Sequence, residues 1–259
     1  MGTTSYWPAE PDPPTAMTSP STGSEFFDFD QVHDLEEVPR DLVLVGAGIS
    51  GLEYASMFAT LGVTVTLLDQ HPVLLDFVDR EIIESLRFQL RQLGTLFRLG
   101  EKMVSVGFDG ERDRVFAKLE SGKNVHGQGL LYTIGRQANT DQMYIDVAGL
   151  KPDVRGKISV NENFQTMVPH IYAAGDVIGF PALASTSMEQ GRLASCHMFS
   201  KPGKMPPNLI PYGIYTIPEI SMVGKTEEQL TKEKIAYETG LARYAELAKG
   251  QMLGMSKVC

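Results

Sequence analysis

Cysteine is scarce in this chain, which has only Cys196 and Cys259 among its 259 residues. The two form no CxxC or CxxxxC pair and no metal-ligand spacing, so neither a disulfide framework nor a metal site is expected. Cysteine usage this low fits a reducing cytoplasm, which is where we expect the protein to reside.

Long apolar runs and basic clusters are also missing. No stretch approaches the roughly 20 apolar residues that span a bilayer, and the amino terminus lacks the regions of a signal peptide. The net charge is −9, from 23 basic and 32 acidic residues. Without a basic cluster, neither nucleic acid nor a membrane is an expected partner.

The pattern of strands and helices changes at Asp41. Residues 1–24 are rich in Pro, Ser and Thr, and we expect an irregular arm up to residue 40. DLVLV and VTVTLLD then predict buried strands around a glycine turn and a helix, GAGISGLEYASMFATL. DREIIESLRFQLRQLG predicts an amphipathic helix that Asp79 caps and Gly94 ends. Its apolar face holds Ile82, Ile83, Leu86, Leu90 and Leu93. This β-α-β-α order predicts a parallel sheet.

Shorter elements follow. TLFRLG, KMVSVGF, RVFAKLE and NVHGQG predict strands of an inserted hairpin sheet, and GLLYTIG predicts a return to the buried sheet. KISV and HIYAAGD predict two more strands, and a helix is expected over Leu183–Phe199. Near the carboxyl end, Thr226 and Gln229 have the spacing of a capping box.

The glycine turn has the pattern GxGxxG, formed by Gly46, Gly48 and Gly51. Between a strand and a helix, these glycines allow a tight turn, a close approach of backbone to pyrophosphate, and tight helix packing. Asp69 ends the second strand 18 residues after Gly51, where an acid binds ribose hydroxyls. The sequence therefore predicts a dinucleotide site. Asp69 favours NAD(H). His71 is expected to be a solvated loop histidine, although in its protonated form it would help to hold a 2′-phosphate.

Two further carboxylates are candidate ligands. Glu53 lies in the first turns of the predicted helix, where it would bond a nicotinamide amide, pair with a lysine near a flavin, or face solvent. Gly175 and Asp176 end the predicted strand HIYAAGD, at the edge where open α/β sheets meet ligands. From these residues alone, a capped strand-to-helix turn without a ligand explains Asp176 better than a ligand site does.

The order of GAGISGLEYASMFATLG, VTLLD, TIGRQANTD, VPHIYAAGDVIG and IPEISMVGKTE resembles the flavin-dependent pyridine nucleotide-disulfide oxidoreductases. FPALASTSMEQGRLAS is most similar to the transhydrogenase branch of that family. The resemblance covers residues 41–250.

The resemblance implies roles for single residues. Gly46, Gly48, Gly51 and Asp69 would hold the nicotinamide nucleotide, with Glu53 and Gly135 beside its nicotinamide ring. Gly175 and Asp176 would hold the ribityl and phosphate part of FAD, and the backbone of Leu183 and Ala184 would face the flavin ring. No residue is assigned a catalytic acid–base role.

The implied fold is α/β: a Rossmann-like, doubly wound NAD(P)-binding domain (41–150) with an inserted hairpin sheet. Residues 151–203 would be the second part of an FAD-binding domain, and 204–259 the start of a truncated dimerisation domain. Residues 1–40 would be an arm or the remnant of the first FAD segment. On this interpretation the chain is a fragment of an enzyme that forms a homodimer when complete.

The implied activity is FAD-dependent hydride transfer between NADPH and NAD+. Three other interpretations stay open: a dihydrolipoamide dehydrogenase-like disulfide reductase, a flavin-free nucleotide-binding module, and a nonfunctional gene remnant. Cys196 fits a helix core better than a nucleophile.

Overall fold

The computed structural model describes residues 3–4, 25–28, 31–135, 137–203 and 211–252. The chain divides into two compact units. One comprises Pro8–Ile134 with Gly213–Cys259, and is called here the nucleotide unit. The other comprises Met1–Trp7 with Gly135–Tyr212, and is called the α3 unit. No helix among the described residues is both long and apolar enough to cross a membrane.

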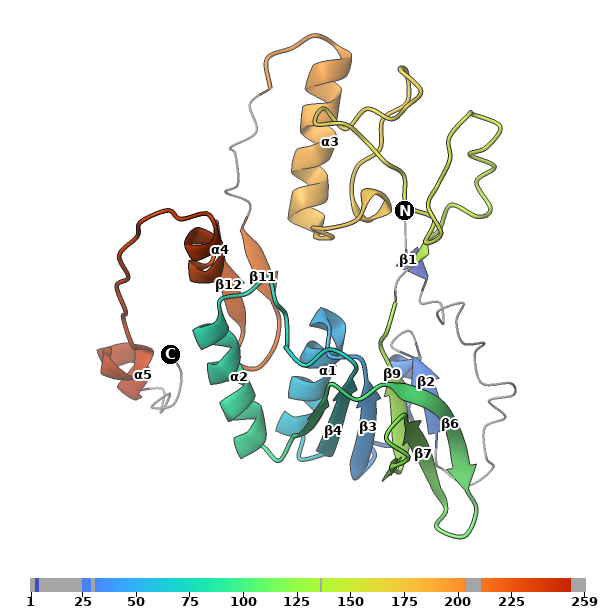
Figure 1. The fold of residues 1–259 in the computed structure, drawn as a ribbon, viewed down its shortest axis with the longest axis vertical. Coiled ribbons are helices and arrows are strands. Elements are labelled where there is room, and N and C mark those ends of the chain that lie inside the picture. Colours follow the sequence, from blue (N-terminus) through green and yellow to red (C-terminus); the bar gives the residue numbers. More distant parts are fainter. Residues whose placement is uncertain (1–2, 5–24, 29–30, 136, 204–210, 253–259) are drawn as a thin grey trace. The chain divides into compact units, whose positions relative to one another are not determined.

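The nucleotide unit is built on a five-stranded sheet in the order β2-β9-β3-β4-β5, in which every pair is parallel. Its strands are β2 (Glu25–Asp28), β3 (Asp41–Val45), β4 (Thr64–Asp69), β5 (Leu96–Leu99) and β9 (Gly129–Tyr132). Figure 1 shows α1 (Ile49–Thr60) alongside β3 and β4, and α2 (Arg80–Gln92) leads into β5. This is the predicted parallel α/β sheet.

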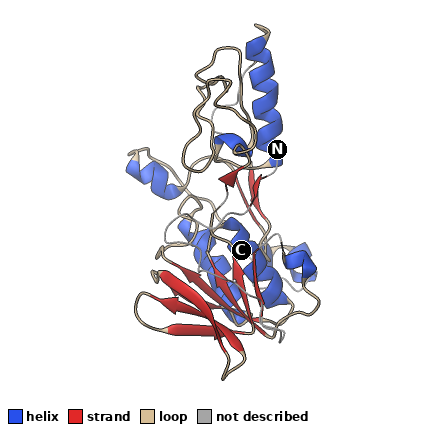
Figure 2. Cartoon of the chain, turned by 90° about the vertical axis from the view of Figure 1, so that its right-hand side faces the viewer, coloured by secondary structure: helices blue, strands red, loops and turns tan. Residues whose placement is uncertain are grey.

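A three-stranded antiparallel meander packs on the same sheet, formed by β6 (Met103–Asp109), β7 (Arg114–Leu119) and β8 (Asn124–Gly127). Alternate residues of β7 are buried, namely Val115, Ala117 and Leu119. The meander lies against β3 and β9, and its strands lie in the foreground of Figure 2. With helices and meander around it, β3 is apolar from Leu42 to Val45, as parallel strands covered on both faces are.

Two features of this unit differ from the predictions. TLFRLG does not belong to the inserted sheet, because β5 pairs in parallel with β4 and is part of the main sheet. The arm expected over residues 1–40 contains β2, which pairs with β9, and a short 3-10 helix (Val32–Asp34). A four-residue strand with two central phenylalanines has too little periodicity to be recognised before its partner strand is known.

The carboxyl-terminal segment adds β11 (Tyr212–Ile214) paired with β12 (Ile220–Met222), followed by α4 (Glu227–Lys232). The predicted capping box of Thr226 and Gln229 is present in both directions. A 3-10 turn (Tyr244–Glu246) and the five-residue helix α5 (Ala248–Met252) end the described chain.

The α3 unit has little regular structure apart from α3 (Ala184–Met198), which confirms the predicted helix. A two-residue strand β1 (Thr3–Thr4) pairs with β10 (Gln137–Ala138), and Asp176–Ile178 form a 3-10 turn. Its core consists of Phe164, Leu193 and Ala194, against which Val160, Tyr172 and Ile178 pack.

Neither KISV nor HIYAAGD is a strand in the structure. The backbone of HIYAAGD makes one isolated bridge, between Gln165 and Tyr172, and turn bonds such as Ile171 N–H to the Val168 carbonyl. Ile158 likewise donates a single bond to the Val177 carbonyl. Apolar composition predicted these strands, but a strand also needs a neighbour along its whole edge, and none of the described residues supplies one.

Helix α2 tests how precisely the apolar face was predicted. Asp79 caps it by accepting from the Glu81 N–H at 3.3 Å, as expected. Ile83, Leu86 and Leu90 are buried, but Ile82 and Leu93 are 37% and 43% exposed. The buried stripe is therefore narrower than the predicted face.

Replacing Leu90, which is fully buried, with alanine is expected to lower the free energy of unfolding by about 2–5 kcal/mol, because it leaves a cavity under α2. The matched control is Leu93→Ala at the end of the same helix, for which we expect a change within about 0.5 kcal/mol. Chemical denaturation followed by circular dichroism measures both. Equal losses would contradict the assignment of the core face.

Candidate dinucleotide site

The glycine turn joins β3 to α1 and is held by bonds from neighbouring strands. Gly46 N–H donates to the Leu68 carbonyl of β4 at 2.8 Å, and the Thr133 hydroxyl, just past β9, donates to the Gly46 carbonyl at 3.0 Å. Gly46 has φ +108°, and a Cβ there would lie 2.7 Å from the Ile134 side chain. Only glycine fits this position without strain.

The other two glycines have opposite surroundings. A Cβ on Gly51 would lie 1.8 Å from the Gly46 carbonyl oxygen, so this glycine allows α1 to pack against the turn. Around Gly48 a Cβ would meet nothing within 4 Å. Gly48 is the N-cap of α1, which has no side-chain cap and no acidic residue in its first turn. An open, uncapped helix amino terminus of this kind is suited to an anion such as pyrophosphate.

Asp69 lies against this turn, as its position at the end of β4 predicted. Its Oδ2 accepts from the Ala47 N–H at 2.6 Å, and its Oδ1 accepts from the His71 N–H at 2.8 Å. The structure therefore brings Gly46, Gly48, Gly51 and Asp69 together at the carboxyl edge of the sheet.

Glu53 has a partner that sequence reasoning did not consider. Its Oε1 accepts from the Tyr215 N–H at 2.8 Å, across 162 residues of chain. One turn further along α1, the buried Ser56 hydroxyl accepts from the Ile217 N–H at 3.1 Å. Glu53 and Ser56 thus dock the segment between β11 and β12 onto α1.

A second docking point joins the amino termini of α2 and α4. Asp79 accepts from the Glu227 N–H at 3.2 Å, and Glu228 accepts from the Arg80 N–H at 3.4 Å. Each carboxylate satisfies a free N–H at the start of the other helix and interacts favourably with its dipole. No sequence signal marks such pairs, because the residues are 148 positions apart.

The other predicted site residues lie in the α3 unit. They are Gly135, Gly175, Asp176, Leu183 and Ala184. Gly175 has φ +84°, and its N–H donates to Oε1 of Gln190 at 2.7 Å. Asp176 follows in the 3-10 turn, Leu183 is the uncapped N-cap of α3, and Ala184 begins that helix and is exposed. Gly135 has φ +87° at the start of this unit.

Sequence reasoning missed two buried polar residues of α3. Gln190 is 3% exposed and fixes the Gly175 backbone, and Thr186 is 1% exposed. Among the described residues, nothing bonds the Thr186 hydroxyl. In the sequence, these two residues are marked only by being polar on the helix face that also carries the apolar Leu193 and Ala194.

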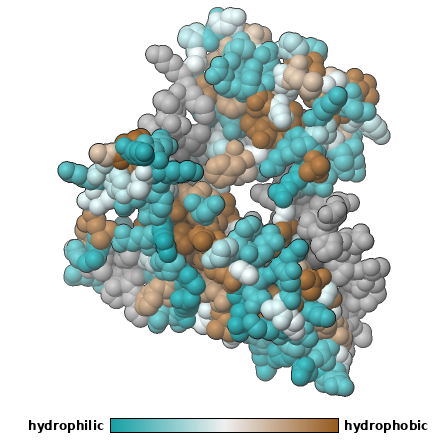
Figure 3. Space-filling view, viewed as in Figure 1, coloured by the Kyte–Doolittle hydropathy of each residue, from teal (hydrophilic) through white to brown (hydrophobic). Residues whose placement is uncertain are grey.

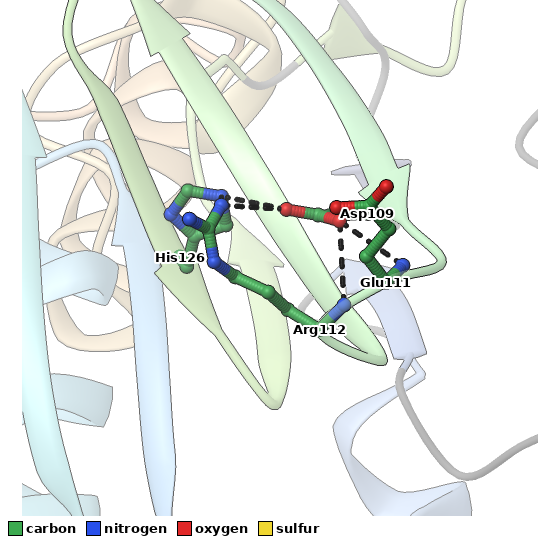
Figure 4. A network of polar contacts seen from close by, with 4 residues as sticks. All are labelled: Asp109, Glu111, Arg112 and His126. Carbon is green, nitrogen blue, oxygen red and sulfur yellow. Dashed lines mark hydrogen bonds and ion pairs between the residues drawn. The ribbon is translucent and has the colours of Figure 1, made fainter.

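The meander carries a separate polar cluster, drawn in Figure 4. The Asp109 carboxylate accepts from Arg112 at 2.8 Å and lies 3.4 Å from His126 Nε2. Desolvation favours a higher pKa for Asp109, but hydrogen bonds from Arg112 and Glu111 outweigh it and leave the pKa below its usual range. The cluster holds the β6–β7 turn, which accounts for its contacts.

Cys196 lies half-buried on α3 with its sulfur 4.0 Å from an Arg192 nitrogen, and Cys259 lies outside the described residues. Within the described ranges, no three His, Cys, Asp or Glu side chains gather as metal ligands do.

Comparison with known proteins places this geometry in a family. The profile of the pyridine nucleotide-disulphide oxidoreductases matches residues 7–191, and that of their dimerisation domain matches residues 210–259. The chain belongs to the pyridine nucleotide-disulphide oxidoreductase family. Members of this family use FAD and NAD(P), and the resemblance inferred from the motifs is confirmed.

Its relatives include two proteins named soluble pyridine nucleotide transhydrogenase. The one from Mycobacterium bovis (strain BCG / Pasteur 1173P2) is 51% identical over 231 residues, which are 88% of this chain and 48% of the relative. The one from Photobacterium profundum is 44% identical over 89% of this chain and 49% of its own length. The chain thus spans about half the length of the curated relatives it matches.

Two solved structures share the fold. The HOCl-induced flavoprotein disulfide reductase RclA from Escherichia coli has a TM-score of 0.84 at 25% identity and covers 97% of this chain and 56% of its own. LpdA from Mycobacterium tuberculosis has a TM-score of 0.80 at 26% identity, covering 88% and 49%. The predicted fold class is therefore confirmed.

The contrast between Gly51 and Gly48 yields a prediction. Gly51→Ala places a methyl group against the Gly46 carbonyl, so we expect it to cost at least about 1–3 kcal/mol of unfolding free energy. Gly48→Ala has open space and should leave stability within about 0.5 kcal/mol, while its methyl group weakens NADH binding. Thermal unfolding and NADH fluorescence titration measure the two effects. Equal stability of both variants would contradict the close packing at Gly51.

The role of Glu53 in docking is testable in the same unit. Glu53→Ala removes the acceptor of the Tyr215 N–H, at a cost of about 1 kcal/mol, and should expose residues 212–222 to about fivefold faster hydrogen exchange. Glu53→Gln keeps an Oε1 acceptor and should exchange like the unaltered chain. Mass spectrometry of the peptides gives the rates, and unchanged exchange in Glu53→Ala would show that the bond does not dock this segment.

Proposed function

We propose that the protein containing this chain transfers hydride from NADPH to NAD+ with the help of a bound FAD. The observation that carries the proposal is 51% identity to a soluble pyridine nucleotide transhydrogenase over 88% of the chain. The glycine turn with Asp69 supports it, because it offers the shape and the donors that a dinucleotide needs.

In this proposal the nucleotide unit binds and orients the nicotinamide nucleotide. The open amino terminus of α1 at Gly48 holds the pyrophosphate, and Asp69 accepts from a ribose hydroxyl. Gly135 would lie beside the nicotinamide ring, as the family resemblance implies. Glu53, which already accepts from Tyr215 N–H, acts there by fixing α1 rather than by moving a proton.

The α3 unit has features that fit a flavin. The buried Thr186 hydroxyl has no partner among the described residues, and α3 begins at Leu183 and Ala184 without a side-chain cap. Gln190 accepts a hydrogen bond from the Gly175 N–H and so fixes the backbone immediately before Asp176. When bound, FAD supplies a ring that takes up and returns hydride. Asp176 would accept hydrogen bonds from its ribityl and phosphate region.

The assembly proposed for the complete protein is a homodimer in the cytoplasm. Residues 210–259 match the family's dimerisation domain. Figure 3 shows hydrophobic side chains at the surface, and Tyr215 and Val223 of this segment are 75% and 57% exposed. Such apolar surface suits a subunit contact.

A second candidate is a disulfide reductase, because the structural neighbour RclA from Escherichia coli is named a flavoprotein disulfide reductase. Its identity to this chain is 25%, against 51% for the transhydrogenase, so it ranks second. A nucleotide-binding module without flavin is the third.

The test combines a spectrum with turnover. The chain and the full-length protein are each mixed with FAD, desalted, and examined for a visible flavin band, then assayed for NADPH oxidation by thio-NAD+ or by lipoamide. Retained flavin with thio-NAD+ reduction is the expected result for the full-length protein. Turnover of lipoamide alone would establish the second candidate, and NADH binding without flavin or turnover would establish the third.

A matched pair of variants separates the flavin site from general stability. Asp176→Asn is expected to weaken flavin retention about tenfold or more, because it removes a charge-assisted hydrogen bond. Asp141→Asn changes an exposed carboxylate of the same unit and should retain flavin fully. Equal retention in both variants would exclude Asp176 from the site.

A further inference from the structure

We propose that Gln190 and His197 of α3 are positioning residues, which hold residues 172–175 in register against the helix and so set where the Asp176 carboxylate meets a flavin. The assignment rests on the function proposed above. Neither side chain is expected to touch the flavin, because both bond to the stretch of chain that leads into Asp176.

The two side chains anchor opposite ends of this short segment. Oε1 of Gln190 accepts from the Gly175 N–H at 2.7 Å, and Nδ1 of His197 lies 2.7 Å from the Tyr172 hydroxyl oxygen. The rings of Tyr172 and His197 also lie against each other, with centroids 5.7 Å apart. The segment therefore runs antiparallel to α3, and Asp176 follows at the end nearer the helix amino terminus.

The spacing of the two anchors fits an extended segment. From Gln190 to His197 the axis of α3 rises by about 10 Å. From Tyr172 to Gly175 an extended backbone also spans about 10 Å. One extended segment can thus satisfy both anchors at once. A slip by one residue, about 3.3 Å, would break both of them.

The contacts between the anchors are apolar. Leu193 and Ala194 are buried with Phe164, and Tyr172 packs against this core. Positions 190, 193, 194 and 197 lie on one face of the helix. Apolar burial keeps the segment close to α3, but it has no direction and does not fix a register. The register therefore depends on the polar bonds at the two ends.

The bond at Gln190 should contribute more than the bond at His197. Gln190 is 3% exposed and Gly175 is buried, so without this acceptor a buried N–H would stay unpaired. His197 is exposed, and water can replace its bond. Gly175 also lies close to α3, since a Cβ there would be 3.0 Å from the Ser187 Oγ. Any shift of Gly175 passes directly to Asp176, the next residue.

The experiment measures the Kd of FAD for the full-length protein by quenching of flavin fluorescence. Gln190→Met removes the acceptor at similar side-chain volume, and His197→Phe keeps a ring without the polar atom. Gln190→Glu keeps an Oε1 acceptor. The matched control is Glu189→Met, which removes two bonds to Arg192, at 2.8 and 2.7 Å, from the neighbouring position of the same helix.

Gln190→Met should raise the Kd of FAD at least about fivefold, and His197→Phe about twofold. Gln190→Glu should bind FAD more tightly than Gln190→Met, and Glu189→Met should bind it like the unaltered protein. In this chain without flavin, hydrogen exchange of the peptide 172–179 should be about fivefold faster in Gln190→Met.

Leu193→Ala separates positioning from stability. It leaves a cavity in the core of the α3 unit but keeps both anchors, so it should lower the Tm while the Kd of FAD stays within about twofold. If the Kd instead follows the Tm across all variants, the two residues act through stability alone and the proposal is wrong. Should Gln190→Met fail to fold, an unchanged Kd in His197→Phe would also overturn it.

Failure of this assignment differs from failure of the proposed function. If the unaltered protein binds FAD, and Gln190→Met and His197→Phe bind it equally well, neither residue positions the site and the proposed function stands. If the unaltered full-length protein binds no FAD, the proposed function and this assignment both fail.

Discussion

The carboxylate of Asp69, bonded to the Ala47 N–H, is the contact on which the arrangement of the site depends. It ties the end of β4 to the turn after β3, while the Gly46 N–H bonds back to the Leu68 carbonyl. With the turn held in this way, the contact between Gly51 and the Gly46 carbonyl sets the position of α1. The open end of that helix then points where the carboxyl edge of the sheet receives a ligand.

The contact between the glycine turn and Asp69 was predictable because its signals are local. GxGxxG, the strand before it and the acid 18 residues after Gly51 lie within one β-α-β unit. The edge strand β2, the docking of Tyr215 on Glu53 and the bond from Gly175 to Gln190 were not predicted. The docking bond in particular joins residues far apart in the chain, whose partners become known only when the fold brings them together.

The errors of prediction have a common physical source. HIYAAGD and KISV have the composition of buried strands, but strand structure depends on hydrogen bonds to a neighbour, and their backbones bond to turns instead. Ile82 and Leu93 are apolar yet exposed, because the rest of the unit covers α2 only along the stripe formed by Ile83, Leu86 and Leu90. Composition predicted which residues are apolar, while packing decided which of them are buried.

The paired amino termini of α2 and α4 have a consequence for where this protein can be divided. The stretch 201–203 looks like a natural boundary, since a proline- and glycine-containing connection begins there. A chain cut at that point would lose the N–H groups that donate hydrogen bonds to Glu53, Ser56 and Asp79. The Arg80 N–H would lose its acceptor, the carboxylate of Glu228. The polar groups on α1 and α2 would then exchange these protein partners for water, and the hydrogen bonds that dock the segment would be lost. The nucleotide unit is thus one folded body made of two separate stretches of sequence, and an excised core needs residues 213–234 to be complete.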